Sequence, residues 1–360
     1  MRIGLVIYDN LEPRSGGYLY DSRLVETLYA HGDEVEILSQ PWKPYSLRLL
    51  QNEDGGFLKR MLSGNFNLIV QDELNHPSLF SLNYRFKQRS RIPIVSIVHH
   101  LRISEQPSPL QLPFIRTIEK RYLQSIDRFI FNSLTTQNEV TRFLGSESIG
   151  LVSYPGKDLF SGGLDLVEIL NRCQRLHPVR LVFAGNLIPR KGLDLALQAL
   201  AKVKDLSWTF DIIGDPNTNV KHANQLRNMV FDLGLAERVF FHGRLEPERL
   251  FEQFRKSQVL LSPAQYEGFG ITFVEAMGCG LPVIALKTGA APEVIADGET
   301  GFLVPPGDID GLALALRQLL NEKEMLEKMS VATRKRFDQF PTWEVSMNSI
   351  RSYLFGLSNP

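Results

Sequence analysis

The stretch S-P-A-Q-Y-E-G-F-G-I-T-F-V-E-A-M-G-C-G, residues 262–280, decides how the rest of this chain is organised. It follows an apolar run at 259–261 that predicts a buried parallel strand, and helical periodicity begins near Ile271. A strand, a glycine loop and a helix start therefore follow one another. Gly268 and Gly270 let the backbone approach a ligand closely, and the first N–H groups of a helix have no partner within it. We predict that this corner holds an anion such as a phosphate.

Two carboxylates bracket the corner. Glu267 stands at the loop entrance, and Glu275 lies about one helical turn inside, where a carboxylate can accept hydrogen bonds from two vicinal ribose hydroxyls. A purely structural interpretation is equally open. The segment 272–275 fits a capping box, in which the glutamate satisfies a donor at the helix start, and Glu267 would then be a solvated loop charge.

The spacing of the two glutamates, with G-F-G between them and E-A-M-G-C-G-L-P-V-I-A at the second, resembles the signature of retaining glycosyltransferases of the GT4 family. This resemblance implies an α/β protein of the GT-B fold, with two doubly wound Rossmann-like domains facing across a cleft. It also implies that Glu267 contacts the donor sugar and that Glu275 binds the ribose. The remaining donor-binding residues that it implies in this segment are Gly268, Phe269, Gly270, Ile271 and Thr272.

Length and composition set wider limits. The chain has 360 residues, which favours two domains, and its 40 basic and 40 acidic residues argue against a general nucleic-acid binder. No apolar run approaches the roughly 20 residues that span a bilayer. Met1 and Arg2 lead directly into a strand pattern, which leaves no room for a signal peptide, so we expect a cytoplasmic protein. Cys173 and Cys279 stand alone, which argues against a disulfide framework or a zinc site.

Short apolar runs alternate with helical patterns throughout the chain, which predicts parallel doubly wound sheets with ligands at the carboxyl ends of the strands. The predicted strands lie at 3–8, 34–38, 68–70, 94–98 and 129–131, and then at 180–183, 208–213, 239–241, 259–261, 283–285 and 302–304. Residues 154–163 are dense in turn formers and predict a linker between domains.

The expected domains are an N-terminal domain at 1–155 and a C-terminal domain at 156–340. The resemblance implies that the first recognises the acceptor and the second binds the nucleotide sugar. It also implies that residues 341–360 form a helix that packs back on the first domain.

In the first half, Gly16 and Gly17 follow the first predicted strand. An isolated glycine pair usually marks a tight turn, whereas the resemblance implies a loop that closes over the donor diphosphate. His99 and His100 follow the fourth strand, at the edge where ligands bind. The resemblance places His99 near the donor sugar, while His100 stands where the family usually has aspartate.

In the second half, Arg190 and Lys191 precede a predicted helix. Two cations at a helix N-terminus oppose the macrodipole, at a cost of a few tenths to about 1 kcal/mol each, and a diphosphate would compensate both. The alternative is that both side chains extend into water. The resemblance implies that this arginine and lysine neutralise the leaving diphosphate, and that Gly214 lies near the nucleotide base.

The sequence predicts no metal site and no cofactor beyond the nucleotide-sugar donor, which is a substrate. Asp308-Ile309-Asp310 has the D-x-D pattern of metal-dependent transferases, but it follows Pro305-Pro306-Gly307 and opens a helix. We therefore predict that Asp308 is a helix N-cap.

Between residues 84 and 128 there are nine basic residues and three acidic ones. This stretch, with aromatic residues interleaved, fits either a solvated face or a surface for anionic lipid headgroups or an anionic substrate. The second interpretation predicts a peripheral contact at the inner face of a membrane.

The expected activity is metal-independent, retaining transfer of a sugar from a UDP-, GDP- or ADP-sugar to a hydroxyl acceptor. The acceptor class would be a glycan, a glycolipid or lipid-linked acceptor, or a polysaccharide precursor of the cell envelope. Two alternatives stay open: a sugar-nucleotide epimerase of similar fold, which the glutamate spacing disfavours, and a noncatalytic subunit that binds the nucleotide sugar.

Overall fold

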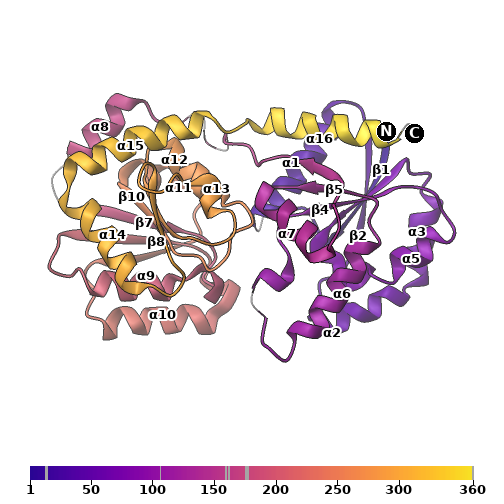
Figure 1. Ribbon diagram of the computed structural model, residues 1–360, viewed down its shortest axis with the longest axis horizontal. Helices are drawn as coiled ribbons and strands as arrows, with labels where there is room; N and C mark the ends of the chain where they lie inside the picture. Colours follow the sequence, from indigo (N-terminus) through magenta and orange to yellow (C-terminus); the bar gives the residue numbers. More distant parts are fainter. Residues whose placement is uncertain (13–14, 106, 159, 161–162, 175–177, 359–360) are drawn as a thin grey trace. The chain divides into compact units, whose positions relative to one another are not determined.

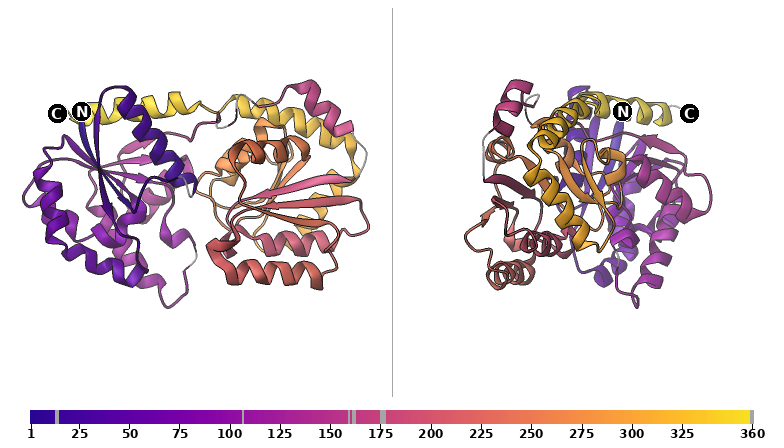
Figure 2. Two further views of the ribbon diagram at one scale, coloured as in Figure 1. Left: turned by 180° about the vertical axis from the view of Figure 1, so that it is seen from behind. Right: turned by 60° about the vertical axis from the view of Figure 1, so that its left-hand side comes forward.

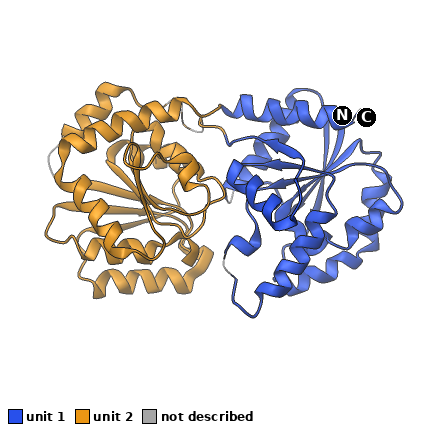
Figure 3. Ribbon diagram, in the orientation of Figure 1, with its two compact units in different colours: residues 1–155, 342–360 blue, residues 156–341 orange. Residues whose placement is uncertain are grey.

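A computed structural model describes residues 1–12, 15–105, 107–158, 160, 163–174 and 178–358. The chain forms two compact units, which Figure 3 shows in separate colours. Unit 1 contains residues 1–155 and 342–360, and unit 2 contains residues 156–341. Among the described residues, no helix has both the length and the apolar character needed to cross a membrane.

The centre of unit 1 is a six-stranded parallel sheet in the order β2-β1-β3-β4-β5-β6. The strands are β1 (Arg2–Tyr8), β2 (Glu34–Gln40), β3 (Leu68–Asp72), β4 (Ile94–Val98), β5 (Arg128–Phe131) and β6 (Gly150–Val152). Every residue of β3 and β4 is buried, as expected for central strands covered on both faces. The strand order reverses between β1 and β3, which is where such sheets bind ligands.

The helices of unit 1 connect these strands. They are α1 (Gly16–Ala30), α2 (Tyr45–Arg48), α3 (Gly55–Ser63), α4 (His76–Leu79), α5 (Leu82–Lys87), α6 (Leu112–Gln124) and α7 (Leu134–Leu144), with 3-10 turns η1 (Leu49–Glu53), η2 (Glu73–Asn75) and η3 (Arg102–Glu105). The C-terminal helix α16 (Trp343–Ser358) returns to this unit and runs beside α1 (Figure 1). Ser153 Oγ donates to the carbonyl of Ser346 at 3.0 Å, and Arg351 pairs with the buried Asp33 at 2.6 Å. These contacts fix the chain's last helix to its first unit.

Unit 2 contains a second six-stranded parallel sheet, in the order β12-β11-β10-β7-β8-β9. Its strands are β7 (Val179–Ala184), β8 (Trp208–Ile213), β9 (Val239–Gly243), β10 (Val259–Ser262), β11 (Val283–Leu286) and β12 (Gly301–Val304). Its helices are α8 (Leu166–Gln174), α9 (Leu193–Ala201), α10 (Val220–Asp232), α11 (Pro247–Lys256), α12 (Ile271–Gly278), α13 (Ala291–Val294), α14 (Ile309–Asn321) and α15 (Lys323–Asp338), with turns η4 (Pro189–Lys191) and η5 (Pro216–Asn219). Helices α9 and α10 lie on one side of the sheet and α12 and α15 on the other (Figures 1 and 2).

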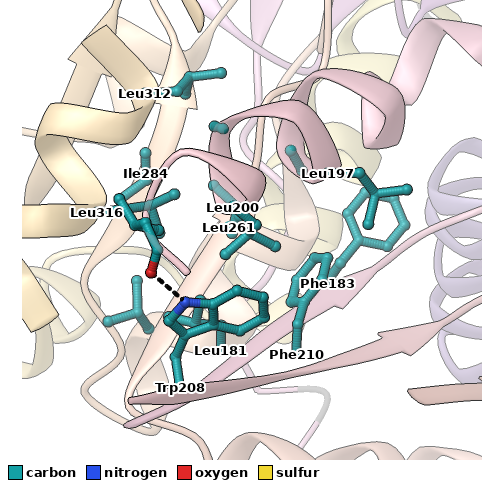
Figure 4. Packing of buried hydrophobic residues seen from close by; sticks show 14 of the residues in the cluster. Leu181, Phe183, Leu197, Leu200, Trp208, Phe210, Leu261, Ile284, Leu312 and Leu316 are labelled. Carbon is teal, nitrogen blue, oxygen red and sulfur yellow. Dashed lines mark hydrogen bonds between the residues drawn. The ribbon is translucent and has the colours of Figure 1, made fainter. Parts of the chain in front are cut away.

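The core of unit 2 forms where α9 packs on β7 and β8 (Figure 4). Phe183 and Phe210 from the two strands lie beside Leu197 and Leu200 from the helix, and all four are fully buried. Trp208 is also buried, and its indole N–H donates to the carbonyl of Val203 at 2.9 Å. The tryptophan therefore fills the core without leaving a polar atom unpaired.

The predicted α/β fold class with two Rossmann-like domains is confirmed, and each predicted strand overlaps an observed one. The prediction missed β6, because G-L-V is too short to carry a recognisable alternation. The predicted linker at 154–163 spans the boundary between the units at 155/156, and residues 159, 161 and 162 lie outside the described part of the chain.

A cluster of buried ionisable side chains lies within unit 1. Glu73 on η2, His76 on α4 and Glu119 on α6 are each at most 4% exposed. The two carboxyl groups hydrogen bond to each other, and Glu119 also accepts from the backbone N–H groups of Arg102 and Ile103, at 2.5 and 3.2 Å. Burial raises the pKa of Glu73 and of Glu119 to about 8, and burial lowers the pKa of His76 to about 4. The cluster therefore holds at least one proton between the two acids at neutral pH.

This shared proton makes the stability of the fold depend on pH. These two carboxyl groups bind more protons in the folded protein than in the unfolded chain between the usual glutamate pKa and about 8, and the lowered pKa of His76 offsets part of this only at the acidic end of that window, so the free energy of unfolding is expected to fall as pH rises toward about 8. Glu119→Gln cannot ionise and should flatten this dependence. The measurement is thermal melting of the full chain from about pH 5 to about pH 8. Glu147→Gln, at an exposed position of the same unit, is the control. An unchanged pH slope in the Glu119 variant would contradict the shared proton.

Candidate functional site

The strand order of unit 2 reverses between β7 and β10, so the loops that follow these two strands flank the expected ligand position. Most of the predicted site residues of this unit lie on these two loops and on the start of α12. The η4 turn after β7 carries Arg190 and Lys191, and the loop after β10 carries Glu267 to Gly270.

Three hydrogen bonds join the two loops. The backbone N–H of Gln265 donates to the carbonyl of Arg190 at 2.8 Å, and a guanidinium N–H of Arg190 donates to the carbonyl of Tyr266 at 2.7 Å. The ammonium group of Lys191 donates to Glu267 Oε1 at 2.5 Å. The loops thus hold a cation and a carboxylate against each other at the switch point of the sheet.

The ion pair adds a partner that the sequence pattern did not predict. We expect a diphosphate to compensate Arg190 and Lys191, and within the protein Glu267 compensates Lys191. The side chains of Lys191 and Glu267 are only 18% and 14% exposed, so neither charge is fully solvated. The helix that follows, α9, begins at Leu193. Asp194 lies in its first turn, where a negative charge interacts favourably with the positive N-terminal end of the helix dipole.

Close packing between the backbones of the two loops explains why residue 192 is a glycine. Gly192 has a φ of +65°, and a Cβ there would lie 2.0 Å from the carbonyl oxygen of Pro263 in the facing loop. Any larger residue would push the two loops apart. Gly214, predicted near the nucleotide base, follows β8, and its backbone packs directly against Gly185 of the loop after β7.

The start of α12 has the predicted position and lacks a side-chain cap. Gly270 is the N-cap residue at a φ of +92°, and a Cβ on it would lie 2.3 Å from the ring of Phe273. Thr272 is the second residue of the helix, so the capping box with Thr272 as the cap does not form. Phe269 is buried, and its ring packs on that of Phe340 with the ring centroids 6.0 Å apart. The side chain is thus used for packing, and the backbone of Phe269 is its contribution to the loop.

Glu275 lies on the buried side of α12. Glu275 is 8% exposed, and burial alone raises its pKa to about 7, with no hydrogen bond from the described residues to offset this. A buried carboxyl group without a donor is unfavourable in the free protein. A ligand that supplies hydroxyl donors would relieve this and favour the ionised form.

In unit 1, the residues predicted to contact the donor, the glycine pair at its diphosphate and His99 at its sugar, gather where the strand order reverses. Gly16 and Gly17 form the first turn of α1, so the glycine pair belongs to a helix start and not to a separate tight turn. His99 follows β4, and a Cβ on Gly17 would lie 3.0 Å from its imidazole ring. The small residue therefore lets α1 approach the histidine.

A buried aspartate orients His99. Asp21 lies one helical turn after Gly17 and is completely buried, and its Oδ1 is 3.2 Å from His99 Nε2. The amide of Asn132 donates to the His99 carbonyl at 2.9 Å. Burial lowers the pKa of His99, but the charge and hydrogen bond of Asp21 together with the charges of Asp72 and Glu73 outweigh burial, so the pKa is raised overall. His100 instead pairs with Glu105 at 2.9 Å, outside this group.

Sequence reasoning missed the acidic partners in unit 1. Asp21 carries no motif, because its role depends on a contact with a residue 78 positions later. Asp72 ends β3 and is buried beside Asp21 and His99, and burial raises its pKa to about 7. A signal was available in Q-D-E-L-N-H at 71–76, a polar run directly after an apolar strand.

Two groups in unit 1 have the spacing of metal ligands. The ligand atoms of Asp21, Asp72 and His99 lie within 4.8 Å of one another, and so do those of Glu73, His76 and Glu119. In the second group both imidazole nitrogens already lie within hydrogen-bond distance of other atoms: Nδ1 is 3.1 Å from the carbonyl of Glu73, and Nε2 is 3.0 Å from the hydroxyl of Tyr45. Because both nitrogens have these partners, the second group is better suited to hold a proton than to bind a metal ion.

The D-x-D segment has the structural role predicted for it. Asp308 accepts a hydrogen bond from the N–H of Gly311 at 2.8 Å and caps α14, which confirms the prediction. Asp310 pairs with Lys202 at 2.7 Å.

Comparisons with known proteins agree with this geometry. Residues 175–336 match the family described as glycosyl transferases group 1. The chain is 27% identical over 293 residues to a D-inositol 3-phosphate glycosyltransferase of Streptomyces griseus subsp. griseus, covering 73% of this chain and 61% of the relative. It is 28% identical over 291 residues to the enzyme of that name from Gordonia bronchialis, covering 74% and 61%. The chain thus spans about three fifths of the length of these relatives.

Solved structures share the fold across the whole chain. Sucrose-phosphate synthase from Thermosynechococcus elongatus matches with a TM-score of 0.81 at 20% identity, covering 99% of this chain and 98% of the other. HepE of Anabaena, solved in complex with UDP and glucose, matches with a TM-score of 0.74 at 21% identity, covering 99% and 100%. Residues 175–336 therefore match the glycosyl transferases group 1 family, and the chain has the GT-B fold of these solved structures.

Proposed function

We propose that this chain transfers a sugar from a nucleotide diphosphate sugar to a hydroxyl acceptor, with retention at the anomeric carbon and without a metal ion. The observation that carries the proposal is the pairing of Lys191 with Glu267 at the switch point of unit 2, beside the uncapped start of α12. The two relatives above are named glycosyltransferases, and HepE was solved with UDP-glucose as well as with UDP and glucose, which supports this donor class.

In the proposed reaction, the diphosphate replaces Glu267 as the partner of Lys191. Charge on the departing phosphate grows as the sugar bond breaks, and Lys191, Arg190 and the α12 N-terminus stabilise that charge electrostatically. Released from the lysine, the Glu267 carboxylate accepts hydrogen bonds from hydroxyls of the donor sugar. The ion pair thus keeps both groups in position while the donor is absent.

The remaining residues bind the two ends of the donor. Glu275 accepts hydrogen bonds from the ribose hydroxyls, which gives its buried carboxyl group the donors that it lacks in the free protein. The backbone from Gly268 to Thr272 surrounds the diphosphate, and Gly214 lies near the base. His99, held by Asp21 and closely packed by Gly17, is proposed to contact the donor sugar, and unit 1 to bind the acceptor.

The bond changes balance without a covalent enzyme intermediate. The bond from the anomeric carbon to the phosphate oxygen breaks, and the acceptor oxygen attacks from the same face. The departing phosphate oxygen accepts the proton of the acceptor hydroxyl, so the acid and the base are both substrate groups. The protein supplies position and electrostatic stabilisation.

The direct test is a screen of UDP-, GDP- and ADP-sugars by thermal shift and by donor hydrolysis, with and without EDTA. We expect one nucleotide class to raise the melting temperature, slow hydrolysis of that donor, and no effect of EDTA on either. Activity lost in EDTA and restored by manganese or magnesium would show that a metal is needed. Donor epimerisation without transfer would indicate the epimerase, and binding without turnover a noncatalytic subunit.

Lys191→Ala separates the two roles proposed for the lysine. Because its charge acts most strongly on the leaving group in the transition state, kcat should fall by on the order of 100-fold, more than the donor KM rises. The ligand-free variant should also melt a few degrees lower, since the half-buried Glu267 loses its partner at about 1 to 3 kcal/mol. The double variant Lys191→Met/Glu267→Gln, which removes both charges, should recover most of the melting temperature and none of the activity. A kcat near wild type in Lys191→Ala would show that the diphosphate binds elsewhere.

Glu275→Ala should weaken donor binding and leave the fold intact. The loss of a charged acceptor for the ribose hydroxyls is expected to reduce affinity by roughly 1.5 to 3 kcal/mol. Because the variant removes a carboxyl group whose ionised form burial disfavours, the melting temperature of the free protein should not fall. Titration calorimetry with the nucleotide diphosphate measures the first effect and apo melting the second. A lower melting temperature with unchanged affinity would assign Glu275 a structural role.

A further inference from the structure

We propose that helix α6 and the turn before it form a docking surface for an anionic lipid membrane. The surface consists of exposed residues of unit 1 and the partly exposed Lys120, and we call it the α6 surface: Leu110, Leu112, Phe114, Arg116, Lys120 and Arg121. It is separate from the candidate donor site of unit 2, so the inference does not depend on the proposed reaction. Figure 1 shows α6 on the outside of its unit.

The tip of the α6 surface is apolar and faces water. Leu110 is 94% exposed, the largest value among the large hydrophobic residues recorded as exposed in the described chain, and Phe114 is 53% and Leu112 37% exposed. Single exposed apolar residues are common, but three within five positions, followed by a helix, form a patch. Moving these side chains out of water is favourable, so the patch favours a partner with an apolar interior.

The helix behind the tip is basic on its outer face. Arg116, Lys120 and Arg121 follow within seven residues, and at helical spacing they border the solvent side. The one acid of α6, Glu119, is fully buried and accepts hydrogen bonds from the backbone of Arg102 and Ile103. Within the described helix Leu112–Gln124, the outer face therefore carries positive charges and no acid of its own.

Ion pairs compensate half of the basic residues that the wider stretch carries outside α6. Lys87 pairs with Asp127 at 2.6 Å, Arg85 with Glu53 at 3.2 Å, and Arg102 with Glu105. These charges are already compensated within the protein, while Arg89, Arg91 and Arg128 add to the basic character of the stretch. Arg116 instead packs over the ring of Phe143 at 5.5 Å, so its guanidinium group is held at the surface without a carboxylate partner.

The combination of an apolar tip and a basic helix fits a lipid surface better than other partners. At a membrane the apolar tip enters the headgroup boundary, while long basic side chains keep their charges near the phosphates. A soluble polyanion would use the charges and would leave Leu110 and Phe114 in water. A second copy of the chain would bring two positive faces together, which is unfavourable.

The test is co-sedimentation of the full chain with two kinds of vesicle, phosphatidylcholine alone and phosphatidylcholine mixed with phosphatidylglycerol. Each basic residue near an anionic surface contributes roughly fivefold in affinity, so we expect binding to the mixed vesicles to exceed binding to the neutral ones by on the order of 100-fold. Added salt should weaken it. No difference between the two kinds of vesicle would overturn the proposal.

Two pairs of substitutions separate the apolar and the basic contributions. Leu110→Ser with Phe114→Ser, and Arg116→Ala with Arg121→Ala, should each reduce binding to mixed vesicles by about tenfold or more. The matched controls are Phe231→Ser, a 77% exposed residue on α10, and Lys59→Ala with Arg60→Ala, two exposed basic residues on α3. Both controls should bind as the wild type does. Because every substituted side chain is exposed, melting temperatures should stay unchanged, which verifies folding.

Two outcomes would assign the surface to another partner. If the apolar pair binds mixed vesicles as the wild type does and soluble polyphosphate competes equally, the α6 surface is a polyanion site. If the wild type is dimeric by light scattering and the apolar pair is monomeric with unchanged vesicle binding, the surface joins two copies of the chain. Either result overturns membrane docking, and neither affects the donor screen.

Discussion

The ion pair between Lys191 and Glu267 is the interaction on which the candidate site depends. It joins the loops after β7 and β10, the two strands at which the order of the unit 2 sheet reverses. The backbone hydrogen bond from Gln265 to Arg190 and the close packing of Gly192 on Pro263 hold the loops at the distance that this pair requires. An ion pair with both side chains less than a fifth exposed is costly to break unless a new partner arrives. A diphosphate is such a partner for the lysine, and the hydroxyl groups of a sugar are such partners for the glutamate.

The other candidate site residues include carboxyl groups that are buried without a charge or hydrogen bond that fully offsets the burial. Glu275 in unit 2 and Asp72 in unit 1 both have a pKa raised to about 7 by desolvation. In unit 1, burial also forces Glu73 and Glu119 to share a proton, while Asp21 compensates His99. Such groups are unfavourable for stability alone, and they gather where the strand order of each sheet reverses. The same physical rule therefore points to a ligand in unit 2 and to a tuned histidine in unit 1.

The α6 surface shows the opposite arrangement, with charges and apolar side chains left in water. Its acid, Glu119, is turned inward to bind the backbone at 102 and 103, so the charged residues on the outer face of α6 are all basic. One helix thus contributes to a buried acidic cluster on one side and to a proposed membrane contact on the other.

The sequence by itself determined the architecture and much of the unit 2 site. Alternating apolar runs specify parallel strands because both faces of such strands are buried, and the glycine corner at 268–270 specifies a helix start because few other residues accept its backbone angles. The N-cap role of Asp308 was also readable, since it depends on residues only three positions apart. Only the tertiary structure decided the partners. Lys191 and Glu267 are 76 positions apart, and Asp21 and His99 are 78 apart, so no local pattern encodes either contact. Local chemistry acts over a few residues and is visible in the sequence, whereas pairing and burial arise when the sheet brings distant loops to one edge.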